Sequence, residues 1–275
     1  MNSVQLGLLL FLLASGLTLI FGIMDFINLS HGSFYMMGAY FCGSVVARTG
    51  SFLAGVITGL VGVFVLGALI EWLIARKLYK EDHLDHVLVT FGLILVMDTL
   101  VHLIWGPSGL SIPLPDMLNG QIVIGTIVFP TYRTLIIVGG LAVAAILYLL
   151  VARTRLGMLI RAGASNRDMV ESLGINIDRL FLIVFAIGAA MAGFAGILIA
   201  PITEATIGMG NDIIIIAFVV VIVGGIGSID FLKLLMEPQF AETAAPAISA
   251  MLVYILMAAV LAFKPSGLFP PAGSR

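Results

Sequence analysis

The sequence predicts an all-α fold, a polytopic bundle of transmembrane helices. Of its 275 residues, 61% are hydrophobic and only 10% are charged, and the mean hydropathy is +1.18. A soluble domain carries about 25% charged residues, so this chain could not cover its surface with polar groups in water. Its long apolar runs do not alternate with polar residues, which excludes a transmembrane barrel. The composition therefore excludes a soluble enzyme and a nucleic-acid-binding protein.

About eight apolar runs approach the length of a spanning helix, which needs about 20 residues. They are Val4–Met24, Phe34–Ala47, Phe52–Ala75, Val87–Trp105, Thr134–Ala152, Leu180–Ala200, Ile213–Gly227 and Ile248–Phe263. We expect residues 1–275 to form a single transmembrane domain that carries a basic loop at residues 153–179.

Lysine and arginine gather in alternate loops, and such loops face the cytoplasm. Three lie in Arg76–His86 and five in Arg153–Arg179, whereas the loops between hold only Arg48 and Arg133. We therefore expect these two basic loops inside and the N-terminus outside. The external loop before Arg133 is rich in proline and glycine, which predicts turns and a short hairpin across Gln121–Phe129.

The basic loop contains signals for a short helix outside the membrane, at about Asn166–Leu173. Ser165 is a suitable N-cap, Asp168 favours the positive helix start, and Gly174 is a natural residue just past the end. Met169, Val170 and Leu173 are expected on one side. Two interpretations stay open, an ordinary basic loop or a docking helix for a cytoplasmic partner.

Four motifs in order resemble one family. They are GLTLIFGIMDFINLSHGSFYMMGAY (Gly16–Tyr40), RTRLGMLIRAGASNRDMVESLGINIDR followed by FAIGAAMAGFAGIL, VVVIVGGIGSI (Val219–Ile229) and FKPSGLF (Phe263–Phe269). They resemble the permease subunits of bacterial ABC importers for branched-chain amino acids, in the form of the first of two paired permeases. Related permeases for urea and short amides share these motifs, so the solute stays open.

The resemblance implies a multi-pass permease of the bacterial inner membrane, without catalytic activity of its own. A second permease would complete the path, two cytoplasmic ATPase subunits would bind ATP, and a periplasmic binding protein would deliver the solute. No phosphate-binding G-x-x-x-x-G-K-[ST] loop is present, and the single Cys42 excludes a cysteine-based metal site; we expect no cofactor. The residues expected to couple to the ATPases are Arg161, Ser165, Asn166, Arg167, Asp168, Met169, Glu171, Ser172 and Gly174.

Polar residues between the first two spans are candidates for the translocation path, because polar groups are costly in lipid. Asn28, Ser30, His31 and Gly32 could form a broken-helix element there, beside Asp25. The alternative is an interfacial turn in which Asn28 or Ser30 caps the next helix.

Three other features have ordinary structural interpretations. Asp98 and His102 share a helix face and are expected to contact a neighbouring helix rather than to relay protons. Glu71, before Arg76, is expected to reach the interface. The small residues around Gly188–Gly196 are expected to pack within the subunit rather than against a second permease.

Two other classes of transporter compete with the importer. A secondary transporter driven by an ion gradient would need intramembrane carboxylates, for which only Asp25 and Asp98 are candidates. A passive channel would not need a capped cytoplasmic helix.

The family resemblance also implies one more span than the sequence contains. After Ile229 the stretch DFLKLLMEPQFAETAAPA has too many charges and prolines to cross lipid. Without another crossing, the C-terminus would lie outside. We therefore expect that roughly 15–20 residues, about one span, are absent near Asp230. The alternative is a shorter variant whose last helix has the inverted orientation.

Overall fold

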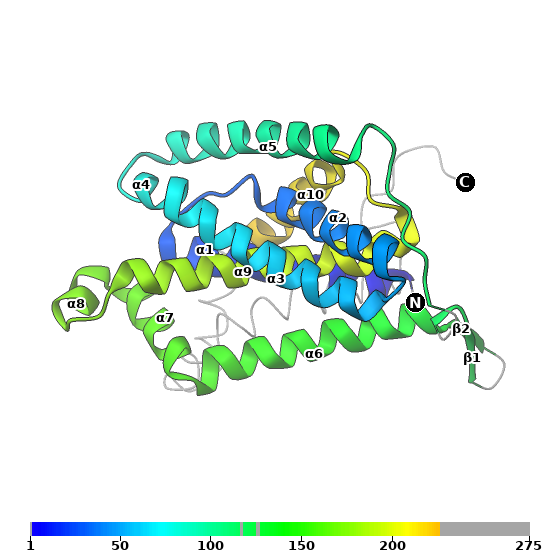
Figure 1. Cartoon of the computed structure of the whole chain (residues 1–275). Helices are drawn as coiled ribbons and strands as arrows, with labels where there is room; N and C mark the ends of the chain where they lie inside the picture. The colour runs from blue at the N-terminus through cyan, green and yellow to red at the C-terminus, as the bar shows by residue number, and fades with distance from the viewer. Residues whose placement is uncertain (1, 116–117, 125–126, 226–275) are drawn as a thin grey trace, which may run out of the picture.

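The computed structural model describes residues 2–115, 118–124 and 127–225 (Figure 1). Within these ranges the chain is a bundle of long helices with one short hairpin. The last expected span, Ile248–Phe263, and the expected absence near Asp230 lie outside the described residues.

Four helices form the centre of the bundle: α1 (Asn2–Met24), α2 (His31–Thr49), α3 (Phe52–Ile70) and α9 (Ile177–Thr203). α9 packs against the other three (Figure 1). Its small residues allow this, because a Cβ on Gly193 would press on Val63 of α3 and one on Gly196 would overlap the backbone of Tyr35. The prediction that this stripe packs within the subunit is confirmed.

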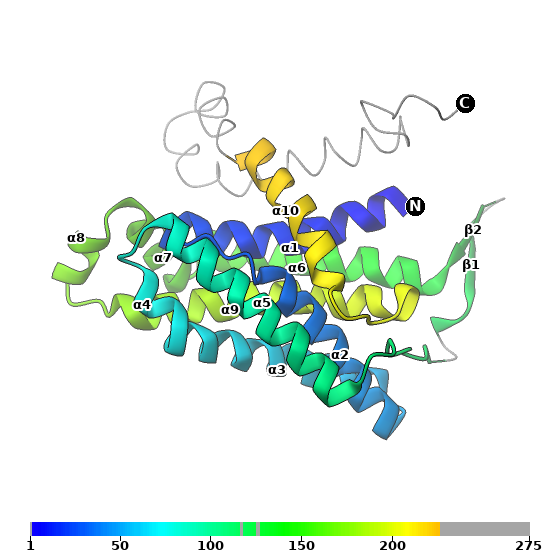
Figure 2. The same cartoon turned by 90° about the horizontal axis from the view of Figure 1, so that it is seen from above.

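The outer helices are α5 (His83–Trp105), α6 (Thr131–Arg153) and α10 (Met209–Gly225). α10 crosses the bundle beside α1 and α2 (Figure 2). α5 and α6 leave large apolar side chains exposed, among them Leu84, Leu88, Leu95, Leu103, Val138, Leu141 and Ile146. Such a surface suits lipid rather than water.

Within the part of the chain that the structure describes, five helical stretches are long and apolar enough to cross a membrane. They are Val4–Met24, Phe52–Leu78, His83–Trp105, Thr131–Arg153 and Ile177–Thr203. The chain is therefore a multi-pass helical membrane protein, but the expected count of about eight spans is not confirmed. α2 and α10 are described as helices without meeting this criterion.

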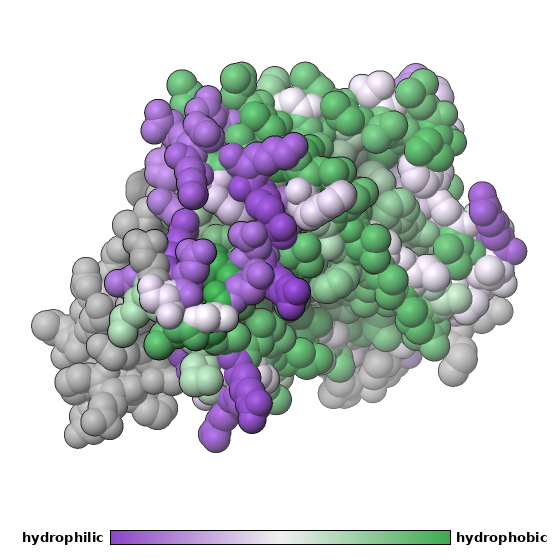
Figure 3. All heavy atoms as spheres, turned by 60° about the vertical axis from the view of Figure 1, so that its left-hand side comes forward, coloured by the Kyte–Doolittle hydropathy of each residue, from purple (hydrophilic) through white to green (hydrophobic). Residues whose placement is uncertain are grey.

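The two basic loops lie at the same end of the bundle, here called the basic end (residues 76–82 and 153–179). After α3 the chain makes a π-helical turn, η1 (Glu71–Ala75), and the short helix α4 (Arg76–Leu78). The second loop contains α7 (Arg155–Ser165) and α8 (Arg167–Ser172). Hydrophilic side chains gather at this end beside a hydrophobic flank (Figure 3). This arrangement agrees with the orientation deduced from the charges.

The opposite end contains the predicted hairpin. β1 (Gln121–Ile124) pairs antiparallel with β2 (Ile127–Pro130), in a register that sets Gln121 opposite Pro130. Nearby, Leu110 and Ala205 exchange two backbone hydrogen bonds of 2.8 and 3.0 Å, which join the loop after α5 to the loop after α9.

Candidate functional site

The short helix predicted in the basic loop exists, but a different residue caps it. Asn166 has an extended backbone, and its Oδ1 accepts a hydrogen bond from the Met169 amide at 3.0 Å. The prediction that Ser165 is the N-cap is wrong, because Ser165 is the last residue of α7. Thr154 caps α7 by accepting from the Gly157 amide at 3.1 Å. The sequence analysis missed α7; the threonine three residues before Gly157 was its start signal.

The end of α8 is as predicted. Gly174 has a φ of +82°, the left-handed conformation that favours glycine. Its amide donates to the Glu171 carbonyl at 2.9 Å, and the Ile175 amide donates to the Val170 carbonyl at 3.4 Å. These two bonds form the Schellman motif, which satisfies carbonyls at a helix end.

Two of the arginines expected to couple to a partner also hold the loop to the bundle. Arg167 donates to the Ile23 carbonyl at 3.0 Å, and its guanidinium lies 5.3 Å from the centre of the Phe181 ring. Arg161 donates to the Val151 carbonyl. Both side chains are half-buried, so their role within this chain is attachment.

The solvent-facing surface of α8 carries two apolar side chains. Met169 is 62% exposed and Leu173 is 71% exposed, whereas Val170 is buried. The prediction that all three share one side is therefore wrong. Asn166, Glu171, Ser172 and Gly174 are also exposed, and Asp168 lies within the helix. This part of the basic end offers apolar contacts surrounded by polar groups, which is typical of a docking surface.

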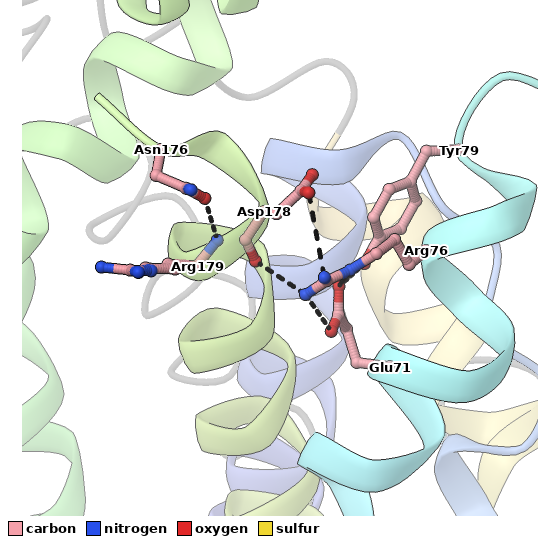
Figure 4. Close-up of polar contacts among 6 residues, drawn as sticks. All are labelled: Glu71, Arg76, Tyr79, Asn176, Asp178 and Arg179. Atoms are coloured by element: carbon pink, nitrogen blue, oxygen red, sulfur yellow. Dashed lines mark hydrogen bonds and ion pairs between the residues drawn. The ribbon is translucent and has the colours of Figure 1, made fainter. Parts of the chain in front are cut away.

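A buried carboxylate lies beside the start of α9 (Figure 4). Glu71 is fully buried and accepts a hydrogen bond of 2.9 Å from the Tyr79 hydroxyl. Arg76 donates to both Glu71 oxygens, at 3.4 and 3.2 Å. The expectation that Glu71 reaches the interface is wrong, because the π-helical turn carries it into the bundle, where two donors offset the loss of water.

Arg76 also joins the two basic loops. Its Nη1 lies 3.8 Å from Asp178 Oδ2, and its Nη2 donates to the Asp178 carbonyl at 3.5 Å (Figure 4). Asp178 stands in the first turn of α9, which Asn176 caps. Burial raises the pKa of Tyr79, and the charge of Glu71 raises it further, so the hydroxyl stays a donor. Sequence reasoning missed this cluster; the signal was a carboxylate inside an apolar run.

The segment between α1 and α2 runs from the basic end into the interior of the bundle. The ring of Phe26 packs 4.8 Å from that of His86, and the Leu29 amide donates to Thr90 Oγ1 at 3.2 Å. His31 then lies beside Leu13, halfway along α1, with its Nε2 3.1 Å from the Leu13 carbonyl oxygen. α2 therefore begins near the middle of the bundle's depth.

The candidate path residues cluster at this start of α2. Asn28, Ser30 and His31 are each 0% exposed. The Ser30 hydroxyl donates to Asn28 Oδ1 at 2.6 Å, so no side chain caps α2. The alternative of an interfacial capping turn is wrong. A Cβ on Gly32 would overlap the Gly210 carbonyl, so α2 and α10 touch there through their backbones.

Asp98 and His102, which share a face of α5, have different surroundings. Asp98 Oδ2 accepts from Asn211 Nδ2 at 3.1 Å, which confirms a contact with the neighbouring helix α10. His102 is exposed on α5. Asp25 lies at the basic end, 3.7 Å from His83, with 63% of its side chain exposed.

Comparison with known protein families decides the identity. Residues 1–266 match the family described as the permease component of branched-chain amino acid transport systems. The chain belongs to this family. It shares 34% identity over 250 residues with the high-affinity branched-chain amino acid transport system permease protein LivH of Escherichia coli (strain K12), covering 83% of this chain and 78% of LivH.

Other permeases of the family match over similar lengths. BraD of Pseudomonas aeruginosa is 28% identical over 288 residues, which covers 97% of this chain and 93% of BraD. This alignment is longer than the chain, so it opens gaps in the chain. A protein named as probable LivM of Methanocaldococcus jannaschii is 27% identical over 245 residues, 79% of this chain and 68% of that protein. No solved structure shows significant similarity.

Proposed function

We propose that this permease is one transmembrane subunit of an ATP-driven ABC importer for branched-chain or other hydrophobic amino acids. The family match over residues 1–266 carries the proposal. The names of LivH and BraD, high-affinity branched-chain amino acid transport system permease proteins, support the solute class. These names do not favour the alternative, a permease for urea or short amides.

The partners follow from this role. A second permease completes the translocation path, and the similarity to both LivH and LivM proteins supports a paired arrangement. Two cytoplasmic ATPase subunits bind and hydrolyse ATP, so this chain needs no cofactor. A periplasmic binding protein delivers the solute to the end that carries the hairpin. The location is the bacterial inner membrane, with the basic end in the cytoplasm.

The coupling element extends from Arg161 to Gly174, and α8 is its docking surface. Exposed Met169 and Leu173, with the exposed polar residues Asn166, Glu171 and Ser172 around them, support this role. Arg161 and Arg167 fix the element to the bundle. A displacement of α8 by the ATPase subunit is therefore transmitted to the core helices. Arg76 adds a second connection, from the start of α9 to the end of α3.

The translocation path passes Asn28, Ser30, His31 and Gly32. An extended segment that brings polar groups to mid-depth is tolerated only inside protein or beside a cavity. A transporter driven by an ion gradient is not favoured, because neither candidate carboxylate is buried and unpaired. Asp25 is exposed at the basic end, and Asp98 is bonded to Asn211.

A thiol cross-linking experiment tests the coupling surface. The native Cys42 is buried, so Met169→Cys adds an accessible thiol to α8. Co-expressed with its ATPase subunit, this variant should form a cross-linked product with a short heterobifunctional reagent that joins its new thiol to a lysine amine of the ATPase. Leu103→Cys is the matched control. Leu103 is 74% exposed and lies near the end of α5 that is opposite the basic end, so this variant should give no cross-linked product. Cross-linking at Leu103 but not at Met169 would contradict the assignment.

A further inference from the structure

We propose that the N-terminal end of α2 binds the carboxylate of the amino acid during its passage, through the Asn28 amide and the Ser33 hydroxyl. This inference rests on the proposed function, because it assigns a solute group to a point on the translocation path. In this proposal the Asn28 amide and the Ser33 hydroxyl meet the solute and select its negatively charged carboxylate.

The first observation is the position of this helix start. α2 is 19 residues long and begins beside Leu13, halfway along α1. A helix N-terminus carries a partial positive charge, which favours an anion. At this start the His31 amide donates to the Asn28 carbonyl at 3.3 Å and the Ser33 amide to the Ser30 carbonyl at 2.9 Å. Ser30 could have capped this helix start, but its hydroxyl is directed to Asn28 Oδ1. The positive end of α2 is thus left without a side-chain cap at the depth where water is excluded.

The second observation is independent and concerns side chains. Asn28 Nδ2 and Ser33 Oγ are buried and have no hydrogen-bond partner among the residues that the structure describes, and their residues are 0% and 2% exposed. Buried polar groups are almost always paired, and each exception calls for an explanation. Both groups can donate a hydrogen bond, and both lie within the first turn of α2 or just before it. A carboxylate accepts such bonds and would satisfy both donors.

His31 adds a hydrogen-bond acceptor to this helix start. Its Nε2 lies 3.1 Å from the Leu13 carbonyl oxygen, which can only accept, so Nε2 carries the proton. In the neutral ring Nδ1 is then an acceptor, and it too is buried without a partner. This acceptor belongs to the same helix start as the two donors, and it suits the ammonium group of a zwitterion. The combination selects an amino acid over an uncharged amide.

α2 and α10 touch beside this helix start in the present structure. Gly32 and Gly210 meet through their backbones, without side chains between them. A shift of α10 away from α2 would therefore open the site without breaking a side-chain bond at that point. Asn211, the next residue along α10, is tied to Asp98 of α5, which fixes where α10 returns.

The test uses the complete transporter in proteoliposomes, with binding protein, ATP and labelled L-leucine. Ser33→Ala removes one unpaired donor, and Asn28→Asp places a negative charge where the carboxylate would bind. The matched control is Ser15→Ala, because Ser15 is also buried but its hydroxyl donates to the Leu12 carbonyl at 3.1 Å. Uptake per ATP hydrolysed is the readout, together with the melting temperature of each purified complex.

We expect Ser33→Ala to lower uptake per ATP by about tenfold, which corresponds to about 1.4 kcal/mol, the scale of one hydrogen bond to a charged group. Asn28→Asp should lower it further, and Ser15→Ala should leave it within about twofold of the wild type. The melting temperature of Ser33→Ala should not fall, because no internal bond is lost.

Three results would overturn the inference in distinguishable ways. Unchanged uptake by Ser33→Ala and Asn28→Asp would show that these groups meet no solute. Equal loss in Ser15→Ala would show a general packing effect. Absence of ATP-driven leucine uptake by the wild-type complex would instead contradict the proposed function itself.

Discussion

Replacement of Gly174 by valine tests how much the coupling element depends on the shape of its last turn. Gly174 has a φ of +82°, and a Cβ added there would meet nothing within 4 Å. The cost of a side chain is therefore conformational rather than steric. A left-handed conformation costs a non-glycine residue roughly 1–2 kcal/mol, and a β-branched residue is among the least tolerant.

That cost falls on a small element. α8 has six residues and is exposed over much of its surface, so it has little stability of its own. A loss of 1–2 kcal/mol changes a folded-to-unfolded ratio by roughly 5–30-fold. We expect Gly174→Val to lower ATP hydrolysis stimulated by loaded binding protein severalfold, while membrane insertion stays normal.

The assay compares stimulated and basal ATP hydrolysis in the reconstituted complex. Gly174→Asn is the matched control, because asparagine tolerates the left-handed conformation, and it should retain most of the stimulation. Normal stimulation in a fully inserted Gly174→Val complex would refute the reasoning, as would equal loss in both variants.

Two further substitutions, one with a matched control, test the contacts that stabilise the basic end. Asn166→Ala removes the cap of α8, worth about 1 kcal/mol, and should weaken stimulated ATP hydrolysis, whereas Ser165→Ala should not; the reverse order would restore Ser165 as the cap. Glu71→Ala removes the acceptor of the Tyr79 hydroxyl and leaves Arg76 with Asp178 alone. It should destabilise the purified permease by about 1–3 kcal/mol, measured as a lower melting temperature; an unchanged temperature would show that the buried carboxylate is not stabilising.

Local sequence signals predicted the elements whose causes are local. The hairpin at Gln121–Pro130 follows from turn residues between apolar strands, and the end of α8 follows from one glycine in the left-handed conformation. The two basic loops lie at one end because their charges avoid the membrane. The close packing of α9 follows from small residues spaced one turn apart.

The errors concern choices that depend on contacts distant in sequence. Ser165 and Asn166 are both suitable caps, and the sequence could not decide between them before α7 was known to end at Ser165. Val170 faces inward because the loop is tied to the bundle through Arg167. Glu71 is buried because a π-helical turn redirects it toward its donors, and periodicity does not reveal such a turn.

The candidate path was only half predicted. The sequence named Asn28, Ser30, His31 and Gly32 because polar residues interrupt an apolar region. It could not show that His31 lies level with Leu13, because that position depends on the extended segment packing against α5. Ser33 was missed, since a serine inside a helix is an ordinary residue until its burial and lack of a partner are known.

Leucine accumulation by the permease in liposomes, alone and with its partners, tests most directly whether transport depends on partner subunits. We expect no leucine accumulation by the isolated chain under any proton or sodium gradient. We expect ATP-dependent leucine accumulation once the second permease, the ATPase subunits and the loaded binding protein are supplied. Robust accumulation by the isolated chain, driven by an ion gradient, would contradict the central claim.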